Sequence, residues 1–233
     1  MKADVVALTR VNGGLHELGL SQEEWQRVAP MIARRRSIKR GERLFAAGDV
    51  PTSIYEVHAG CFKTCVASEG GHQQVSGFQI VGDFVGLDGI GSERHVSEGV
   101  ALEDSQVHVI PTAAIAQLSR ESADFQHRFH QMMSREGERG RHMMFLLGSM
   151  HAMERVATFL LDLLQRLNAR GYSSSAVNLC MTRDEIGSYL GLTLETVSRM
   201  FAKLKQSGVL EVSNRDVRIL DPEALRRAAA GLG

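Results

Sequence analysis

The chain has 233 residues, of which 43% are hydrophobic and 23% are charged, and its formal net charge is +0. This composition excludes a disordered chain and is enough for two modest domains. No run of about eighteen apolar residues occurs and the first four residues do not open a signal peptide, so we expect a cytoplasmic protein without a membrane segment. The cysteines Cys61, Cys65 and Cys180 are too few for a disulfide framework, which fits a reducing compartment.

A short helix is predicted close to the N-terminus. Ser21 can cap it, and Glu23 and Glu24 supply acidic side chains in its first turn. Its apolar face is formed by Trp25, Val28, Met31 and Ile32. Pro30 is expected to end or kink this helix, because proline lacks the backbone N–H and its ring clashes with the preceding turn.

Glycine-containing turn signals recur between residues 37 and 111. They separate short apolar segments, such as 54–58, 62–66 and 107–110. Short strands at such spacing are typical of a sandwich or a barrel. Cys61 and Cys65 lie four residues apart, on one face of a strand, and could sense redox state or bind metal. No second cysteine pair stands at zinc-site spacing, so we expect them to be small buried side chains.

Four of the nine histidines also lie in this stretch: His58, His72, His95 and His108. None of them forms an HxH pair with a following glutamate, as a cupin-type metal site would. We therefore expect solvent-exposed or core histidines, and we assign neither metal ligands nor catalytic residues.

Helical patterns follow Pro111, and the longest runs from about Asp124 to Met150. Its apolar and small residues follow the 4-3-4-3 spacing of a coiled-coil seam: Met133, Gly137, Gly140, Met144 and Leu147. The charged residues between them leave the helix too polar for deep burial. Each central glycine costs about 1 kcal/mol of helix propensity relative to alanine, so we hypothesise conditional dimerisation. A second helix over 152–167 and a polar link over 172–176 follow.

The segment from 181 to 220 has the pattern of two short helices and a hairpin. Thr182 and Glu185 form a capping box at the start of the first helix, which Gly191 ends. Thr193 caps the second helix. Its predicted core face consists of Leu194, Val197, Met200, Phe201 and Leu204. Beyond Gly208, apolar and polar residues alternate around 213–216, which predicts a hairpin that we interpret as a wing.

Three polar side chains project from the opposite side of the second helix, namely Glu195, Ser198 and Arg199. In a helix-turn-helix, these positions reach the DNA major groove. Arg199 could bind guanine O6 and N7, Glu195 could accept from cytosine N4, and Ser198 could contact a base or a phosphate. Backbone contacts are expected from Thr182, Arg183, Thr193 and Thr196. The alternative is a surface ion pair between Glu195 and Arg199, worth a few tenths of a kcal/mol.

The run DEIGSYLGLTLETVSR, residues 184–199, resembles the recognition segment of the CRP/FNR family of bacterial transcription regulators, and the FNR branch is the nearer match. In that branch a Glu-x-x-Ser-Arg motif reads a palindrome of TTGAT and ATCAA half-sites. The resemblance implies an α+β fold with a cyclic-nucleotide-binding-like β-roll, a long dimerisation helix and a winged helix-turn-helix. We assign 1–111 to the lead-in helix and roll, 112–171 to the helices, and 172–233 to the DNA-binding domain.

The partners that the resemblance implies are double-stranded DNA, a second copy of the chain and RNA polymerase. The loop around Ala67 to Gln74 matches a surface through which FNR-like activators contact the polymerase. Both activation and repression are compatible with the sequence, and no enzymatic activity is expected. We also consider a cupin-like metalloenzyme with a helical tail as the alternative from another class.

Effectors known in the family require particular residues. Oxygen-sensing members hold an iron–sulfur cluster through N-terminal cysteines, but residues 1–60 contain none and the position of a further ligand falls on His108, so this cluster is not expected. The cAMP-binding Gly-Glu-Leu turn and Arg-Ser pair are replaced by 82–84 (Gly-Asp-Phe) and Arg94-His95, which argues against cAMP. We interpret Arg94 and His95 as a solvated loop. Haem, which some members use to sense gas, stays a candidate, and so does gating by a metabolite.

Overall fold

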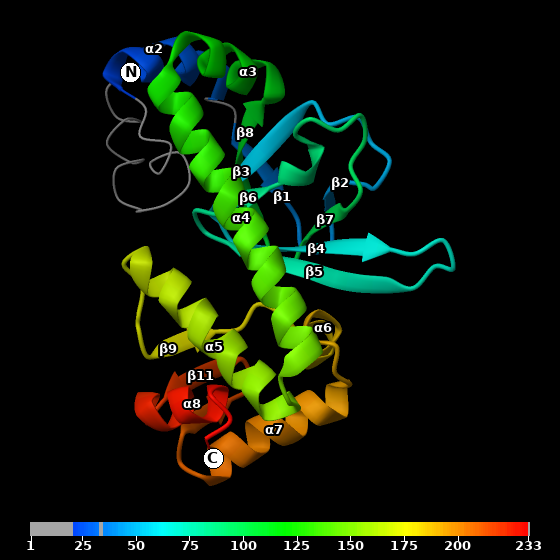
Figure 1. Ribbon diagram of the computed structural model, residues 1–233, viewed down its shortest axis with the longest axis vertical. Helices are drawn as coiled ribbons and strands as arrows, with labels where there is room; N and C mark the ends of the chain where they lie inside the picture. Colours follow the sequence, from blue (N-terminus) through cyan, green and yellow to red (C-terminus); the bar gives the residue numbers. More distant parts are fainter. Residues whose placement is uncertain (1–20, 33–34, 233) are drawn as a thin grey trace. The chain divides into compact units, whose positions relative to one another are not determined.

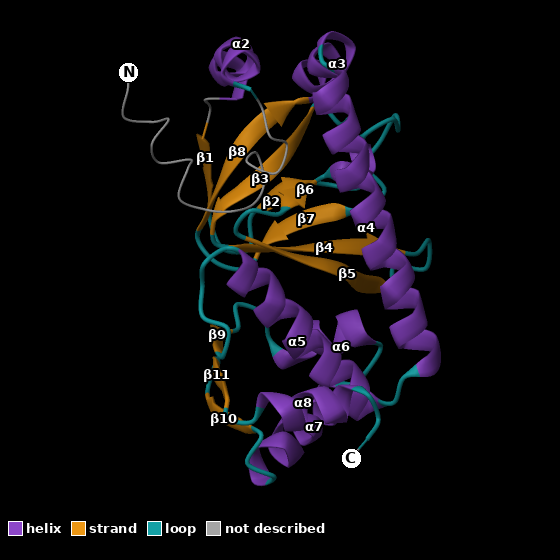
Figure 2. Cartoon of the chain, turned by 60° about the vertical axis from the view of Figure 1, so that its left-hand side comes forward, coloured by secondary structure: helices purple, strands orange, loops and turns teal. Residues whose placement is uncertain are grey.

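The computed structural model describes residues 21–32 and 35–232. The chain divides into two compact units, Met1–Gly137 and Glu138–Gly233. The division falls inside one long helix, α4 (Ala123–Ser149). No helix in the described ranges is both long and apolar enough to cross a membrane. Figures 1 and 2 show the order of the elements along the chain.

The first unit contains two four-stranded antiparallel sheets (Figure 2). One sheet has the order β1-β8-β3-β6 and comprises β1 (Arg35–Ile38), β8 (Ser105–Pro111), β3 (Ser53–Ala59) and β6 (Phe84–Val85). The other has the order β2-β7-β4-β5 and comprises β2 (Arg43–Phe45), β7 (Glu98–Ala101), β4 (Cys61–Ala67) and β5 (Gln73–Ile80). Apolar side chains from both sheets, including Phe45, Phe62 and Val107, share one core. The predicted roll is therefore confirmed.

Three helices pack at one end of the roll: α2 (Gln22–Ile32), α3 (Thr112–Glu121) and the first part of α4. Ser21 caps α2, because its Oγ accepts from the Glu24 amide at 3.2 Å while Glu24 Oε2 accepts from the Ser21 amide at 2.7 Å. The helix continues through Pro30 to Ile32, so Pro30 does not end it, which was one of the two outcomes predicted for this residue. Ile32 is buried in the helical core, which holds this last turn. The side chains of Trp25 and Val28 lie outside the described part of the structure.

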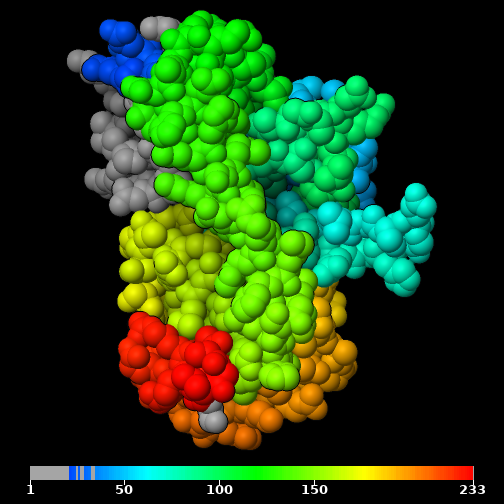
Figure 3. Space-filling view, viewed as in Figure 1, coloured from blue at the N-terminus to red at the C-terminus, as the bar shows by residue number. Residues whose placement is uncertain are grey.

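The β4–β5 hairpin extends beyond the rest of the roll and presents an exposed loop over residues 68–72 (Figure 3). The buried part of β4 contains Cys61 and Cys65, which are 2% and 5% exposed. The expectation of buried cysteine side chains is confirmed for both positions.

The second unit combines the end of α4 with four further helices and a small sheet (Figure 2). Its helices are α5 (Ala152–Ala169), α6 (Arg183–Leu190), α7 (Leu194–Gln206) and α8 (Pro222–Ala229). Its strands, in sheet order, are β10 (Leu210–Ser213), β11 (Asp216–Ile219) and β9 (Ala176–Asn178). The link over 172–176 was predicted to be only a polar connector, but its last residue begins β9. Pairing with β11, which lies far along the chain, makes this segment a strand.

The predicted seam of α4 is largely uncovered in a single chain. Gly137, Gly140 and Met144 are exposed, and Met133 and Leu147 are partly buried. Met144 keeps 69% and its neighbour Phe145 keeps 56% of their surfaces in contact with solvent. Large apolar side chains at this exposure are the feature that a partner surface would cover.

Candidate nucleic-acid interface

Helix α6 begins and ends where the local sequence chemistry predicts. Thr182 Oγ1 accepts from the Glu185 amide at 3.2 Å, and Glu185 Oε2 accepts from the Thr182 amide at 2.8 Å. This reciprocal capping box satisfies two amides that the first helical turn would leave without partners. At the other end Gly191 adopts a φ of 63°, a left-handed conformation that suits glycine.

The turn between α6 and α7 is tight because Gly187 has no side chain. A Cβ at this position would lie 2.6 Å from the carbonyl oxygen of Leu192. The Leu192 amide also donates to the Gly187 carbonyl oxygen at 2.9 Å. Thr193 then caps α7 by accepting from the Thr196 amide at 3.2 Å. The two helices therefore have the short connection of a helix-turn-helix.

Helix α7 has one buried and one exposed side. The buried side chains are Val197, Met200, Phe201 and Leu204, none more than 6% exposed. Leu194, which was also predicted to face the core, is 43% exposed, so that prediction is wrong. Leu194 is the first residue of the helix, one turn before the first buried side chain, Val197. The helix is thus anchored by its last three turns and presents its N-terminal end.

The three predicted base-reading residues share this presented surface. Glu195 and Arg199 are exposed and Ser198 is partly exposed. In the described part of the chain these two charged side chains form no ion pair with each other. Arg199 Nη2 instead donates to Thr196 Oγ1 at 3.5 Å. Hydrogen bonds from the backbone amide of Glu195 and from Thr193 lower the pKa of the Glu195 carboxyl. Both charged groups can therefore reach outward, as base-reading side chains must.

The four residues predicted to contact the DNA backbone have different surroundings. Thr182 and Thr193 are exposed, and their hydroxyls cap α6 and α7. The Thr196 hydroxyl accepts a hydrogen bond from the Thr193 hydroxyl at 3.2 Å. Arg183 instead lies over the ring of Phe201, with 3.6 Å between its guanidinium carbon and the ring centroid. Burial lowers the pKa of Arg183. This cation–π contact joins α6 to α7 and gives Arg183 a packing role.

The wing is an antiparallel sheet with a two-residue turn. Ser213 pairs with Asp216, so Asn214 and Arg215 form the turn, and Asn214 has a φ of 57°. The left-handed conformation is tolerated by asparagine better than by most residues. Lys205, near the end of α7, donates to the carbonyl oxygen of Val212 at 3.2 Å. The predicted hairpin is confirmed, and this contact ties it to α7.

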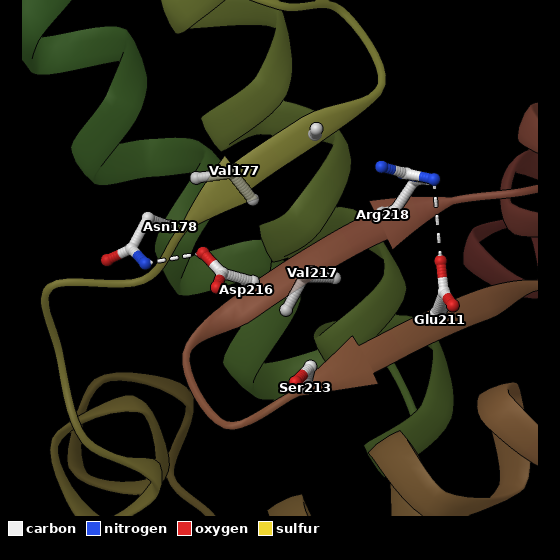
Figure 4. A pocket seen from close by; sticks show the side chains of 8 residues that line it. Val177, Asn178, Glu211, Ser213, Asp216, Val217 and Arg218 are labelled. Atoms are coloured by element: carbon white, nitrogen blue, oxygen red, sulfur yellow. Dashed lines mark hydrogen bonds and ion pairs between the residues drawn. The ribbon is translucent and has the colours of Figure 1, made fainter.

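One face of the wing carries a shallow groove of about 490 Å³ across its three strands (Figure 4). Asn178 donates to Asp216 at 2.6 Å and links β9 to β11. Arg218 and Glu211 form an exposed ion pair at 3.6 Å between β11 and β10. The lining has two acidic side chains, Glu211 and Asp216, and one basic side chain, Arg218, so the groove lacks the positive charge that a phosphate backbone attracts.

Arg155 is a residue that the sequence interpretation did not identify. Its guanidinium donates to the carbonyl oxygens of Leu147 and Met150, at the end of α4, and of Leu190, at the end of α6, at 2.8 to 2.9 Å. Carbonyl groups at helix C-termini have no partners within the helix and carry partial negative charge. A single cation therefore connects the last turn of α4 to the first helix of the helix-turn-helix. No local pattern identifies such a residue, because its three acceptors are distant in sequence.

The roll of the first unit also differs from expectation at one residue. Arg94 is exposed, as predicted for a solvated loop, but His95 is only 4% exposed. Its ring stacks on Phe45, with 4.0 Å between the ring centroids. The interpretation of His95 as a solvated residue is therefore wrong, because a ring from a strand far away in sequence covers it.

Comparison with known proteins identifies two family models on this chain. Residues 35–122 match the cyclic nucleotide-binding domain, and residues 154–228 match the Crp-like helix-turn-helix domain. The chain is 40% identical over 210 residues to the transcriptional regulatory protein Btr of Bordetella pertussis. The aligned region covers 90% of this chain and 87% of Btr. It is 37% identical over 210 residues to the fumarate and nitrate reduction regulatory protein of Escherichia coli, covering 90% of this chain and 84% of that protein.

A solved structure agrees with these relationships. FixK2 from Bradyrhizobium japonicum superimposes with a TM-score of 0.78 at 28% identity, covering 84% of this chain and 96% of FixK2. The curated relatives are transcription regulators and not enzymes, which removes the metalloenzyme alternative. The chain belongs to the CRP/FNR family of transcription regulators.

Proposed function

We propose that this protein is a sequence-specific transcription regulator in which α7 reads a palindrome of TTGAT-like and ATCAA-like half-sites. The observation that carries the proposal is the shared exposed surface of Glu195, Ser198 and Arg199 on the first two turns of α7. Arg199 would bind guanine bidentately, and Glu195 would accept from a cytosine amino group. Ser198 would contact a base or a phosphate. Thr182, Thr193 and Thr196 would contact the backbone, with Arg183 holding α6 on α7.

A homodimer formed along α4 is part of this proposal. The exposed seam residues Gly137, Gly140 and Met144, together with Phe145, offer an apolar and small-residue surface that a second copy would bury. A two-fold dimer presents two recognition helices about 34 Å apart, one turn of DNA. A palindromic site follows from that symmetry.

The remaining partners follow from the family. The exposed loop of the β4–β5 hairpin, within 67–74, is the proposed contact with RNA polymerase, and its projection from the roll would let a large partner reach it (Figure 3). A regulator with these partners works in the cytoplasm. Activation and repression are both compatible with this arrangement.

We propose that neither cAMP nor an FNR-type iron–sulfur cluster controls the protein. Arg94 donates to the Gly48 carbonyl oxygen at 2.7 Å, and Asp83 accepts from the Ile80 amide at 2.9 Å, so both groups are used within the roll. His108, which aligns with a cluster ligand, is buried between Glu56 at 3.0 Å and Arg35 at 3.1 Å. Among the described residues, no group of three or more His, Cys, Asp or Glu could hold a metal ion. Gating by haem or a metabolite is the alternative, and an absorption spectrum of the purified protein distinguishes haem.

The experiment is an aerobic gel-shift titration on a TTGAT/ATCAA palindrome and a scrambled duplex, without added ligand. The wild-type protein should prefer the palindrome. Arg199→Ala should lose about 1–3 kcal/mol of that discrimination, roughly 5- to 150-fold, and leave weak binding to the scrambled duplex unchanged. Arg226→Ala, which removes an exposed arginine on α8, is the matched control. Equal affinity of the wild-type protein for both duplexes would contradict ligand-independent reading by α7.

A further inference from the structure

The carboxylate of Asp88 is surrounded by hydrogen-bond donors from one short loop of the roll. Its Oδ2 accepts from the amides of Val96 and Ser97, both at 3.0 Å, and from the Ser97 hydroxyl at 2.9 Å. Its Oδ1 lies 3.1 Å from Nδ1 of His95. An ionised carboxylate only accepts, so the proton of this contact is on the histidine nitrogen. Three consecutive residues, 95–97, thus direct four donors at one carboxylate.

His95, the first of these residues, is held in place by contacts that do not involve the carboxylate. Both backbone groups of His95 are hydrogen-bonded. Its amide donates to the carbonyl oxygen of Asp49 at 2.9 Å, and its carbonyl oxygen accepts from the amide of Gly48 at 2.8 Å. Its ring is stacked on Phe45. A Cβ at Gly89 would lie 2.7 Å from the Cε1 atom of this ring, so the ring fills its space closely. The position of the His95 ring, and of the backbone that leads into Val96 and Ser97, is therefore set by contacts within the roll.

The donors need an acceptor, and the space they surround is open on one side. Ser97 is only 6% exposed, so its amide and hydroxyl would have no ready replacement from bulk water. The Asp88 side chain keeps 22% of its surface exposed, so its position can be reached from solvent. Converging amide and hydroxyl donors form an anion-binding concavity.

We propose that residues 95–97 form an anion-binding site in the roll, and that its occupant in this chain is the protein's own Asp88 carboxylate. The chain thereby supplies the anion internally, and the segment 86–97 keeps its conformation without an external anionic ligand. A small carboxylate is the class of ion that the site would accept once Asp88 is removed. This inference concerns the roll alone and does not depend on the proposed reading of DNA.

The test is chemical rescue of Asp88→Ala. The substitution keeps Cβ and removes the carboxylate, which leaves space for a formate ion. We expect the melting temperature of the variant to fall by about 5–10 °C. Formate at about 100 mM should restore at least half of that loss, whereas chloride at the same ionic strength should not. Formate should leave the wild-type melting temperature unchanged relative to chloride.

Two further variants test whether formate occupies this site. In Asp88→Ala combined with Ser97→Ala, one donor hydroxyl is missing and the rescue should be lost. Asp104→Ala removes an exposed carboxylate that bonds Lys39 and the amide of Arg40, and it should show no response to formate. Rescue that is equally strong without the Ser97 hydroxyl would overturn the proposal, and so would a formate effect no larger in Asp88→Ala than in the wild type.

The proposal stays testable if Asp88→Ala does not fold in plain buffer. The measurement is then the yield of folded protein after dilution from urea, which should be higher in formate than in chloride. Equal yields would count against the site. In Asp88→Asn the carboxamide fills the same space, so this variant should lose some stability and show no formate response. A response as large as that of Asp88→Ala would indicate a general salt effect and would also overturn the proposal.

Discussion

Arg155→Ala is the substitution whose effect can be worked out most directly from the second unit. The wild-type guanidinium makes three hydrogen bonds of 2.8 to 2.9 Å to carbonyl oxygens, those of Leu147 in the last turn of α4, of Met150 directly after α4 and of Leu190 at the end of α6. The three acceptors come from three different residues, so no single water molecule can replace the fork of donors. We expect loss of this residue to loosen the connection between α4 and α6.

The magnitude follows from the number and kind of bonds lost. A hydrogen bond with one charged partner contributes about 1.5–3 kcal/mol. Arg155 is only partly buried, so water can solvate some of the released carbonyl groups. We therefore expect a loss of about 2–4 kcal/mol in the free energy of unfolding of the second unit, well below three full contributions. Arg155→Lys should recover only part of it, because an ammonium cannot reproduce the planar fork.

Urea unfolding monitored by far-UV circular dichroism, with linear extrapolation, measures this loss. The matched control is Arg218→Ala, which removes an arginine that is 67% exposed and paired with Glu211 at 3.6 Å. This control should cost less than about 1 kcal/mol. If Arg155→Ala is no more destabilising than the control, the three bonds do not hold the helices together and the reasoning fails.

Gly187→Ala should destabilise the second unit by about 2 kcal/mol or more, because the added Cβ would lie 2.6 Å from the Leu192 carbonyl oxygen. Urea unfolding measures this loss. The control is Gly148→Ala, whose added Cβ meets nothing within 4 Å and which should be neutral or stabilising. Gly140→Ala also meets nothing in the single chain, so it should favour the helix by up to about 1 kcal/mol yet weaken a dimer packed on this seam; sedimentation that finds unchanged dimer affinity would argue against the seam. The pKa of His58 is lowered from its ordinary value of 6.5 by burial and by the nearby Arg35 and His108. Between the lowered pKa of folded His58 and its ordinary value of 6.5, the unfolded chain therefore binds more protons than the folded chain. The stability of the roll should decrease as the pH falls through this range; His58→Gln should reduce that decrease, and identical pH profiles would refute the assignment.

Much of the recognition region could be predicted because its signals are local. The capping box of Thr182 and Glu185 closes within three residues, Gly191 ends α6 through its own φ, and the 213–216 turn pairs adjacent strands. The buried face of α7 follows from side-chain spacing along one helix. Each of these features depends on residues a few positions apart, so its geometry can be predicted from the local sequence.

The features that were missed all depend on contacts between distant segments. Residues 176–178 become a strand because β11 pairs with them, and Leu194 is exposed although its spacing matches the core face. His95 is buried because Phe45, fifty residues earlier, covers its ring. Arg155 joins helix ends at Leu147 and Leu190, and no periodicity along the chain could indicate this. Local hydrogen bonding sets where helices and turns begin and end, whereas burial and long-range partners exist only once the chain has folded.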